Sequence, residues 1–219
     1  MLDVRGTSIL QRHVAALNNH GLSDVTVVTG YKAEAVNLPG IKTVLNDAYE
    51  TTGEAASLAL ARDKLTSACV VGYGDIVYRH FILSMLLDCD ADIAVVVDAG
   101  WTARREDGGR KRADLARCSV PFTADFLDDA PVTLTGIGPA IEAVDGEWVG
   151  LMKLSAKGAQ RVASEIDAMA ADGSLATASL PDLLQRLIDA GEQPAVVYVT
   201  GNWLDVNDAF DLAQARNVT

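Results

Sequence analysis

Hydrophobic residues follow two alternating spacings along the first half of the chain. Leu10, Val14 and Leu17 recur at helical spacing, and Gly21 is placed to end that helix, so the pattern predicts a helix over residues 7–20. Short runs of β-branched residues predict strands instead. We expect strands over 25–29, 41–45, 68–71 and 92–97, helices over 53–65 and 79–87, and a helical turn over 32–36. Strands that alternate with helices indicate βαβ units and a mainly parallel sheet covered on both faces.

The pattern loosens between residues 100 and 146, where charged residues separate short alternating runs at 115–120 and 132–137. We expect these runs to form a small antiparallel excursion over the sheet edge. Helical spacing returns over 156–171 and 180–190, followed by a strand over 195–200 and a closing helix over 208–215. Because no repeat, low-complexity tract or Pro/Gly/Ser-rich linker interrupts the chain, we expect one domain over residues 1–219.

Composition narrows the class of protein. With 49% hydrophobic and 22% charged residues the chain is globular, and charges interrupt every apolar run well before the roughly 20 residues of a membrane span. A net charge of -12 argues against a nucleic-acid binder and favours a small charged substrate carried with a divalent cation. Cys69, Cys89 and Cys118 are widely spaced, which is typical of reduced thiols in the cytoplasm rather than of disulfides or a zinc site.

Basic residues cluster in one stretch of the loosened region. Acidic residues are interleaved with them, so this stretch is either a solvated loop or a clamp for an anionic substrate. The basic residues are Arg104, Arg105, Arg110, Lys111, Arg112 and Arg117.

Two predicted strands end in acidic turns. Asp75 follows Gly72-Tyr73-Gly74, and Asp205 and Asn207 follow the strand over 195–200. Ligands of open α/β sheets gather at the carboxyl ends of strands, and Mg²⁺ is commonly held there by one or two carboxylates plus substrate phosphates. The alternative for Asp75 is a turn former or the N-cap of the next helix. For Asp208 we expect an N-cap, with Asp211 in the first helical turn.

The polar segment over residues 46–58 joins a predicted strand to a predicted helix. A helix start with free backbone N–H groups is a site for an anion or a base edge. The alternative is an ordinary cap made by Thr52.

The order of four motifs carries a family resemblance. They are Thr-Gly-Tyr-Lys-Ala-Glu at 29–34, Asn-x-x-Tyr-x-x-Thr-x-x-x-x-Ser-Leu at 46–58, Gly-Tyr-Gly-Asp at 72–75 and Trp-Leu-Asp-Val-Asn-Asp at 203–208. In this order they resemble the nucleotidyltransferase superfamily of the MobA-like and sugar-nucleotidyltransferase type. The chain is most similar to cytidylyltransferases that accept phosphocholine or phosphonates, in particular to the domains found with phosphoenolpyruvate mutase in phosphonate biosynthesis.

The resemblance implies a Rossmann-like, three-layer α/β/α fold and transfer of CMP from CTP, or of another NTP's nucleotide, to a phosphate or phosphonate oxygen, with Mg²⁺ as cofactor. It implies association with a phosphoenolpyruvate mutase or with further copies of the chain. No general base is expected among the three histidines, because the acceptor oxygen is already ionised. Carried over by motif, the metal-binding and catalytic residues are Asp75 and Asp205, with Asn207 beside the metal. The nucleotide-facing residues are Thr52, Gly53, Glu54, Ser57, Tyr73 and Gly74, and the acceptor-facing residues are Trp101, Glu147, Lys153 and Trp203.

Members of this superfamily begin with a strand and a loop of the type Leu-Ala-Ala-Gly-x-Gly-x-Arg that cradles the triphosphate. Residues 2–10 resemble the segment directly after that loop, and neither Gly108-Gly109 nor Gly136-Ile137-Gly138 replaces it. We therefore expect the chain as written to be either a late-started or truncated version of an active enzyme, or an inactive relative. The alternative is a non-catalytic, nucleotide-binding or partner-dependent module. A dinucleotide-dependent oxidoreductase is disfavoured, because no Gly-x-Gly-x-x-Gly follows a first strand.

Overall fold

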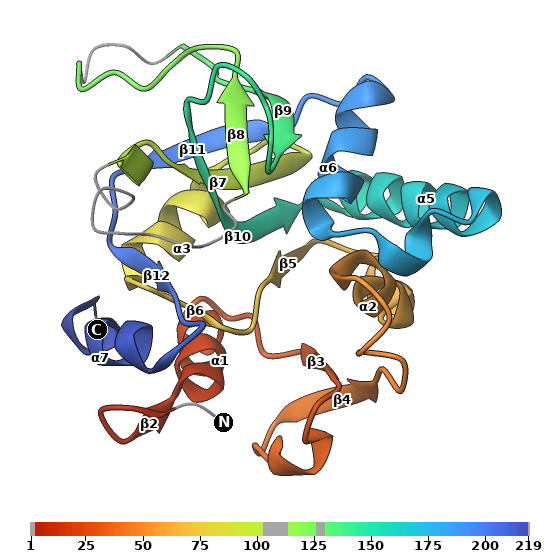
Figure 1. The fold of residues 1–219 in the computed structure, drawn as a ribbon, viewed down its shortest axis with the longest axis vertical. Helices are drawn as coiled ribbons and strands as arrows, with labels where there is room; N and C mark the ends of the chain where they lie inside the picture. The colour runs from red at the N-terminus through yellow and green to blue at the C-terminus, as the bar shows by residue number, and fades with distance from the viewer. Residues whose placement is uncertain (1–2, 103–113, 126–129, 219) are drawn as a thin grey trace.

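A six-stranded mixed sheet forms the centre of the computed structural model, which describes residues 3–102, 114–125 and 130–218 (Figure 1). Strand β11 is parallel to β7, whereas β10 is antiparallel to both β7 and β5. Strands β5, β7 and β11 therefore run in one direction and β10 runs against them. The strands of this sheet are β5 (Cys69–Gly72), β7 (Ile93–Asp98), β8 (Leu115–Cys118), β9 (Leu134–Gly138), β10 (Gly146–Leu154) and β11 (Ala195–Val199).

The predicted antiparallel excursion is present as β8 and β9, which pair antiparallel and join the central sheet through β10. Strand β10 itself was not predicted from the hydrophobic pattern. Its register against β7 shifts between Trp148 and Met152, and Gly150 lies between them with φ +83. A Cβ at Gly150 would lie 2.3 Å from the Tyr73 ring, so only glycine allows this strand to pass Tyr73.

Three two-stranded sheets flank the centre. Strands β3 and β4 pair in parallel, and they begin and end where the sequence predicts them. Strands β6 and β12 pair antiparallel, as do β1 and β2. The bounds are β1 (Asp3–Val4), β2 (Thr7–Ser8), β3 (Val25–Thr29), β4 (Ile41–Leu45), β6 (Ile76–Tyr78) and β12 (Trp203–Asp205).

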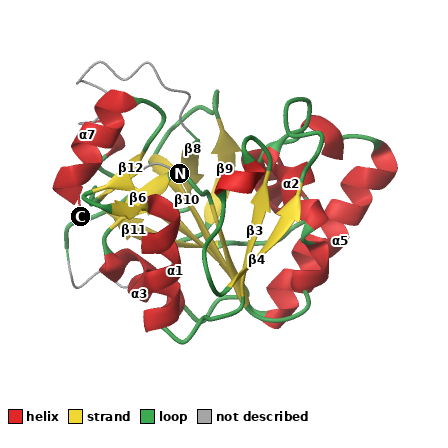
Figure 2. Ribbon diagram, turned by 90° about the horizontal axis from the view of Figure 1, so that it is seen from below, coloured by secondary structure: helices red, strands yellow, loops and turns green. Residues whose placement is uncertain are grey.

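Helices cover both faces of the sheet, which gives the expected mixed α/β architecture in three layers (Figure 2). Strand β7 shows the division: Val95 packs with residues of α5 and α6, whereas Val96 packs with Ile82 of α3. Figure 2 places α1 on the side of α3 and α2 on the side of α5. The bounds are α1 (Ile9–Asn19), α2 (Glu54–Leu60), α3 (His80–Asp88), α5 (Ala156–Asp172), α6 (Leu180–Asp189) and α7 (Ala209–Val218), with short 3₁₀ turns η1 (Ala33–Ala35), η2 (Arg62–Lys64) and η3 (Leu175–Thr177).

Helix boundaries follow local capping chemistry. Helix α1 starts at a capping box in which Ser8 and Gln11 bond each other's backbone N–H groups. The expected cap of α7 is confirmed, because Asp208 Oδ1 accepts from the Asp211 N–H at 2.9 Å. The helix expected over 53–65 is divided into α2 and η2. None of the helices in the described ranges is long and apolar enough to cross a membrane.

Candidate active site

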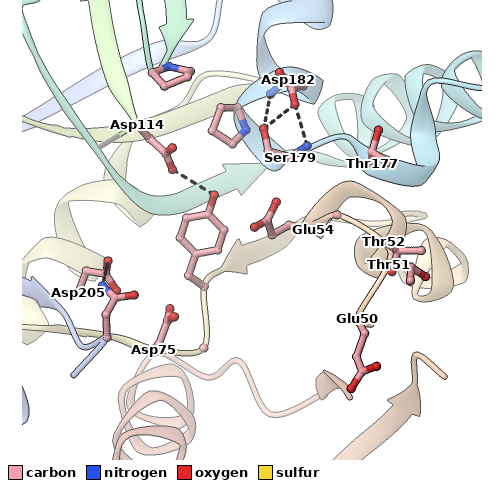
Figure 3. A pocket seen from close by; sticks show the side chains of 16 residues that line it. Glu50, Thr51, Thr52, Glu54, Asp75, Asp114, Thr177, Ser179, Asp182 and Asp205 are labelled. Carbon is pink, nitrogen blue, oxygen red and sulfur yellow. Dashed lines mark hydrogen bonds between the residues drawn. The ribbon is translucent and has the colours of Figure 1, made fainter. Parts of the chain in front are cut away.

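The two predicted metal-binding acids lie side by side because β6 pairs with β12. Asp205 is opposite Ile76 in this antiparallel pair, and Asp75 directly precedes Ile76. The Val206 N–H extends the ladder by donating to the Asp75 carbonyl oxygen at 3.0 Å. Figure 3 shows both carboxylates at one side of the same cavity. Asp75 does not cap the next helix, since α3 begins at His80 with Arg79 as its N-cap.

The cavity beside these acids measures about 820 Å³ and is formed by segments far apart in the sequence. Neither lysine nor arginine is among its described lining residues. Such a wall repels a bare anion and attracts a cation, or an anion that arrives with one. The lining residues are Glu50, Thr51, Thr52, Gly53, Glu54, Tyr73, Gly74, Asp75, Asp114, Pro139, Thr177, Ser179, Pro181, Asp182, Asp205 and Asn207.

The carboxylate oxygens of Asp75 and Asp205 are ligands of the kind that a hard cation prefers. Asp75 is exposed, and Asp205 is half-buried and accepts a hydrogen bond from the Asn207 side-chain amide. Within the described ranges, no three acidic, His or Cys side chains gather as they would around a metal held by protein alone. Mg²⁺ usually takes only one or two carboxylates and completes its shell with water and phosphate oxygens. The Asp75–Asp205 pair therefore fits a Mg²⁺ ion that binds together with a nucleotide.

Asn46 organises the loop on the opposite side of the cavity, and sequence reasoning did not single it out. Only 5% of the residue is exposed. Its side-chain amide donates to Thr52 Oγ1 at 3.0 Å and to Ser57 Oγ at 3.1 Å, and its Oδ1 accepts from the Ala48 N–H. Thr52 remains at the cavity wall, whereas Ser57 is not among the lining residues. The first residue of the Asn-x-x-Tyr motif is the signal that could have revealed this role.

Gly53 is held by a backbone contact with the segment before α6. Its N–H donates to the Ala176 carbonyl at 2.9 Å, and the Ala55 N–H donates to the Ala178 carbonyl at 3.1 Å. These two N–H groups at the start of α2 are therefore occupied and do not form the free anion site considered for this helix. The N-cap is Gly53, with no side-chain cap, so the alternative of a Thr52 cap is wrong.

Tyr73 projects into the cavity from the turn after β5. Its hydroxyl donates to Asp114 Oδ2 at 3.1 Å, and its ring lies 5.3 Å from that of Trp148. Burial raises the pKa of Tyr73, and the nearby carboxylates of Asp114 and Glu54 raise it further. The phenol is therefore neutral at physiological pH and can donate a hydrogen bond. Asp114 was absent from the predicted site, because it lies in a loop whose place depends on the tertiary fold.

The four residues assigned to the acceptor by resemblance lie elsewhere than the lining of this cavity. Trp203 is 5% exposed and its Nε1 donates to Asp98 at 2.8 Å. Lys153 donates to the carbonyl oxygen of Cys89. Glu147 is half-buried in β10, and Trp101 is half-buried just after β7. Their contact with an acceptor stays a prediction.

Most of the basic stretch considered as an anion clamp lies outside the described residues. Arg117 is described: its guanidinium donates to the carbonyl and hydroxyl oxygens of Thr135 on the neighbouring strand β9, at 3.3 and 3.4 Å.

The mixed sheet with helices on both faces is also the fold of solved nucleotidyltransferases. The inositol-1-phosphate CTP transferase from T. maritima has a TM-score of 0.69 at 17% identity over 97% of this chain and 82% of that one. The CTP:phosphocholine cytidylyltransferase from Streptococcus pneumoniae has a TM-score of 0.64 at 15% identity over 99% and 87%.

The chain belongs to the family of MobA-like NTP transferase domains, which matches residues 1–173. A curated relative is the CTP:phosphoglutamine cytidylyltransferase of Campylobacter jejuni subsp. jejuni serotype O:2. It is 20% identical over 231 residues, which cover 97% of this chain and 88% of the relative.

Proposed function

We propose that this protein transfers CMP from CTP to a phosphate or phosphonate oxygen of a small acceptor and releases pyrophosphate. The observation that carries the proposal is the convergence of Asp75 and Asp205 on an acidic cavity in a member of the NTP transferase family. The names of three similar proteins support CTP as donor and a phosphorylated small molecule as acceptor.

In this reaction the acceptor oxygen forms a bond to the α-phosphorus, and the bond from that phosphorus to the bridging oxygen breaks. Pyrophosphate leaves with the electron pair, and the ionised acceptor requires no general base. When bound, Mg²⁺ supplies neutralisation of the phosphate charge. The chain's own part is positional: Asp75, Asp205 and Asn207 would hold the cation, and Thr52, Gly53 and Glu54 would border the nucleotide.

The charge of the cavity bears on the acceptor. Glu54 and Asp114 lie near the Tyr73 hydroxyl, at the same wall as Asp75. An acceptor that carries an ammonium group beside its phosphoryl group suits such a wall better than a purely anionic one. We therefore favour an aminoalkylphosphonate or a phosphocholine-like acceptor.

The test is pyrophosphate release by the full chain with CTP, Mg²⁺ and a panel of phosphate and phosphonate acceptors, with the product identified by mass. The variants Asp75→Asn and Asp205→Asn should each lose about 100-fold or more in rate, because each removes a ligand of the cation that would neutralise the developing charge. Asp88→Asn is the matched control, because Asp88 is an exposed acid at the end of α3, outside this cavity. Rates of pyrophosphate release equal to wild type in all three variants would refute the proposal.

A second candidate is nucleotide binding without turnover. It is favoured by the absence of lysine and arginine from the described cavity lining, since triphosphates are commonly held by such side chains or by free N–H groups. Calorimetric titration with CTP·Mg²⁺ separates the two. Binding with no pyrophosphate release from any acceptor supports this second function.

A further inference from the structure

Asp98 is a fully buried carboxylate at the end of the central strand β7, with 0% of the residue exposed. Its Oδ1 accepts hydrogen bonds from the backbone N–H groups of Gly100 at 2.7 Å and Gly201 at 2.9 Å. Its Oδ2 accepts from Nε1 of Trp203 at 2.8 Å. Burying a charge is costly unless hydrogen bonds compensate, so three donors on one carboxylate indicate a site built around it. Asp98 is not among the residues that line the cavity.

The hydrogen bond to Gly201 holds the turn between β11 and β12. Gly201 has φ +73 and Asn202 has φ +64, so two successive residues are left-handed. Glycine and asparagine are among the residues that adopt this region most readily, so the sequence suits the turn, and neighbouring groups then fix its place. Asp98 holds the turn at Gly201, and the Arg79 N–H holds it at the Asn202 carbonyl oxygen, at 3.0 Å. The start of β12 therefore has its place set by groups on β7 and at the start of α3.

The hydrogen bond to Trp203 holds β12 itself. The indole packs in a buried cluster with Ile82 and Val149, and its Nε1 fixes the ring's orientation on Asp98. Trp203 and Asp205 are two residues apart on an extended strand, so their side chains share a face. Beyond Asp205, the Val206 N–H bonds the Asp75 carbonyl oxygen. A displacement of Trp203 along its strand would therefore displace Asp205 from Asp75.

We propose that Asp98 is a positioning residue for the metal site: through Gly201 and Trp203 it sets where the Asp205 carboxylate lies relative to Asp75. This inference rests on the proposed function, in which those two carboxylates hold the cation. Asp98 acts on the site through β12 and does not itself touch substrate.

The test is Mn²⁺ binding in the presence of a constant, saturating concentration of CTP, measured from the free-ion EPR signal against a protein-free titration of CTP. The Mg²⁺ concentration that gives half-maximal pyrophosphate release is measured alongside. In Asp98→Asn one carboxylate oxygen is replaced by an NH₂ group. Both oxygens accept from N–H donors in wild type, so the NH₂ group faces an N–H donor whichever way the amide turns. Groups that orient metal ligands typically contribute about 10- to 100-fold to metal affinity, and we expect the Mn²⁺ dissociation constant to rise by that factor. Val162→Ala, a cavity-forming change in α5, is the control for lost stability alone, and its metal binding should match wild type.

A second variant separates position from charge. Asp98→Asn also removes a negative charge, whereas Trp203→Phe keeps the charge and removes the Nε1 donor together with part of the buried indole, a loss of packing for which Val162→Ala is the control. We expect Trp203→Phe to weaken Mn²⁺ binding in the same direction by a smaller factor, and it decides the question alone if Asp98→Asn fails to fold. Metal binding equal to wild type in Trp203→Phe overturns the inference even if Asp98→Asn is impaired. If wild type with CTP binds no Mn²⁺ beyond that bound by CTP alone, the metal site itself is refuted and the inference with it; wild-type binding with unaffected variants refutes only the inference.

Discussion

Gly53 should be irreplaceable although its backbone conformation is open to any residue. It has φ -86, yet a Cβ built on it would lie 2.1 Å from the Ala178 carbonyl oxygen and 2.9 Å from the Thr177 carbonyl carbon. Ordinary contacts between such atoms begin near 3.5 Å, so the backbone before α6 would have to retreat by more than about 1 Å. We therefore predict that Gly53→Ala destabilises the protein and distorts the cavity together.

The size of the effect follows from two contributions. Retreat weakens the hydrogen bonds from the Gly53 and Ala55 N–H groups, at about 0.5–1.5 kcal/mol each. Overpacking against a neighbour that cannot rotate away adds about 1–3 kcal/mol. The free energy of unfolding should fall by about 2–6 kcal/mol in all. Because Thr177 and Ser179 form part of the cavity wall, nucleotide binding should weaken as well.

Urea unfolding measures the first effect and calorimetric titration with CTP·Mg²⁺ the second. Gly74→Ala is the matched control: Gly74 lines the same cavity, but a Cβ there meets nothing within 4 Å. Its unfolding free energy should stay within about 0.5 kcal/mol of wild type. If the two alanine variants are equally stable, the close approach of the two backbones is not what requires glycine at position 53.

Three further predictions concern stability, each measured by urea unfolding. Gly150→Ala should lower the free energy of unfolding by about 1–3 kcal/mol more than Gly173→Ala does. Both glycines have φ above +80, but only a Cβ at Gly150 would clash with Tyr73. Equal losses in the two variants would contradict this. Burial lowers the pKa of His13 below 6.5, so the unfolded chain binds a proton that the folded chain does not, and stability falls as the pH drops below that value, by at most about 1.4 kcal/mol per pH unit. His13→Gln should therefore show a shallower loss of stability between pH 7 and pH 5 than wild type, and an unchanged slope would exclude His13 as the source. Asp208→Ala removes the cap of α7 and should lower the free energy of unfolding by about 1 kcal/mol. An unchanged free energy of unfolding would mean that other groups hold the start of the helix.

The sequence predicted those elements whose pattern is local. Strands β3 and β4 were predicted to the residue, because a run of β-branched residues between polar turns has few other stable conformations. The cap at Asp208 and the alternation of strands with helices are local in the same sense. The three-residue strands β6 and β12 were missed, since neither is long enough to show a period. Strand β10 was missed because Gly146, Gly150 and Lys153 interrupt its apolar run.

The site shows the same division. Residue types and motif order alone drew attention to Asp75 and Asp205, because an acid after a strand is visible in the sequence. That they lie side by side depends on the pairing of β6 with β12, which joins residues more than a hundred positions apart. Asp98 directly follows the strand predicted over 92–97 and so carried the same signature, but the sequence did not show that it is buried on three N–H donors. Asp114 had no such signature. A carboxylate's chemistry is a property of its residue, but whether it meets solvent, a tyrosine or three N–H donors is decided by the elements packed around it, and that packing exists only in the folded chain.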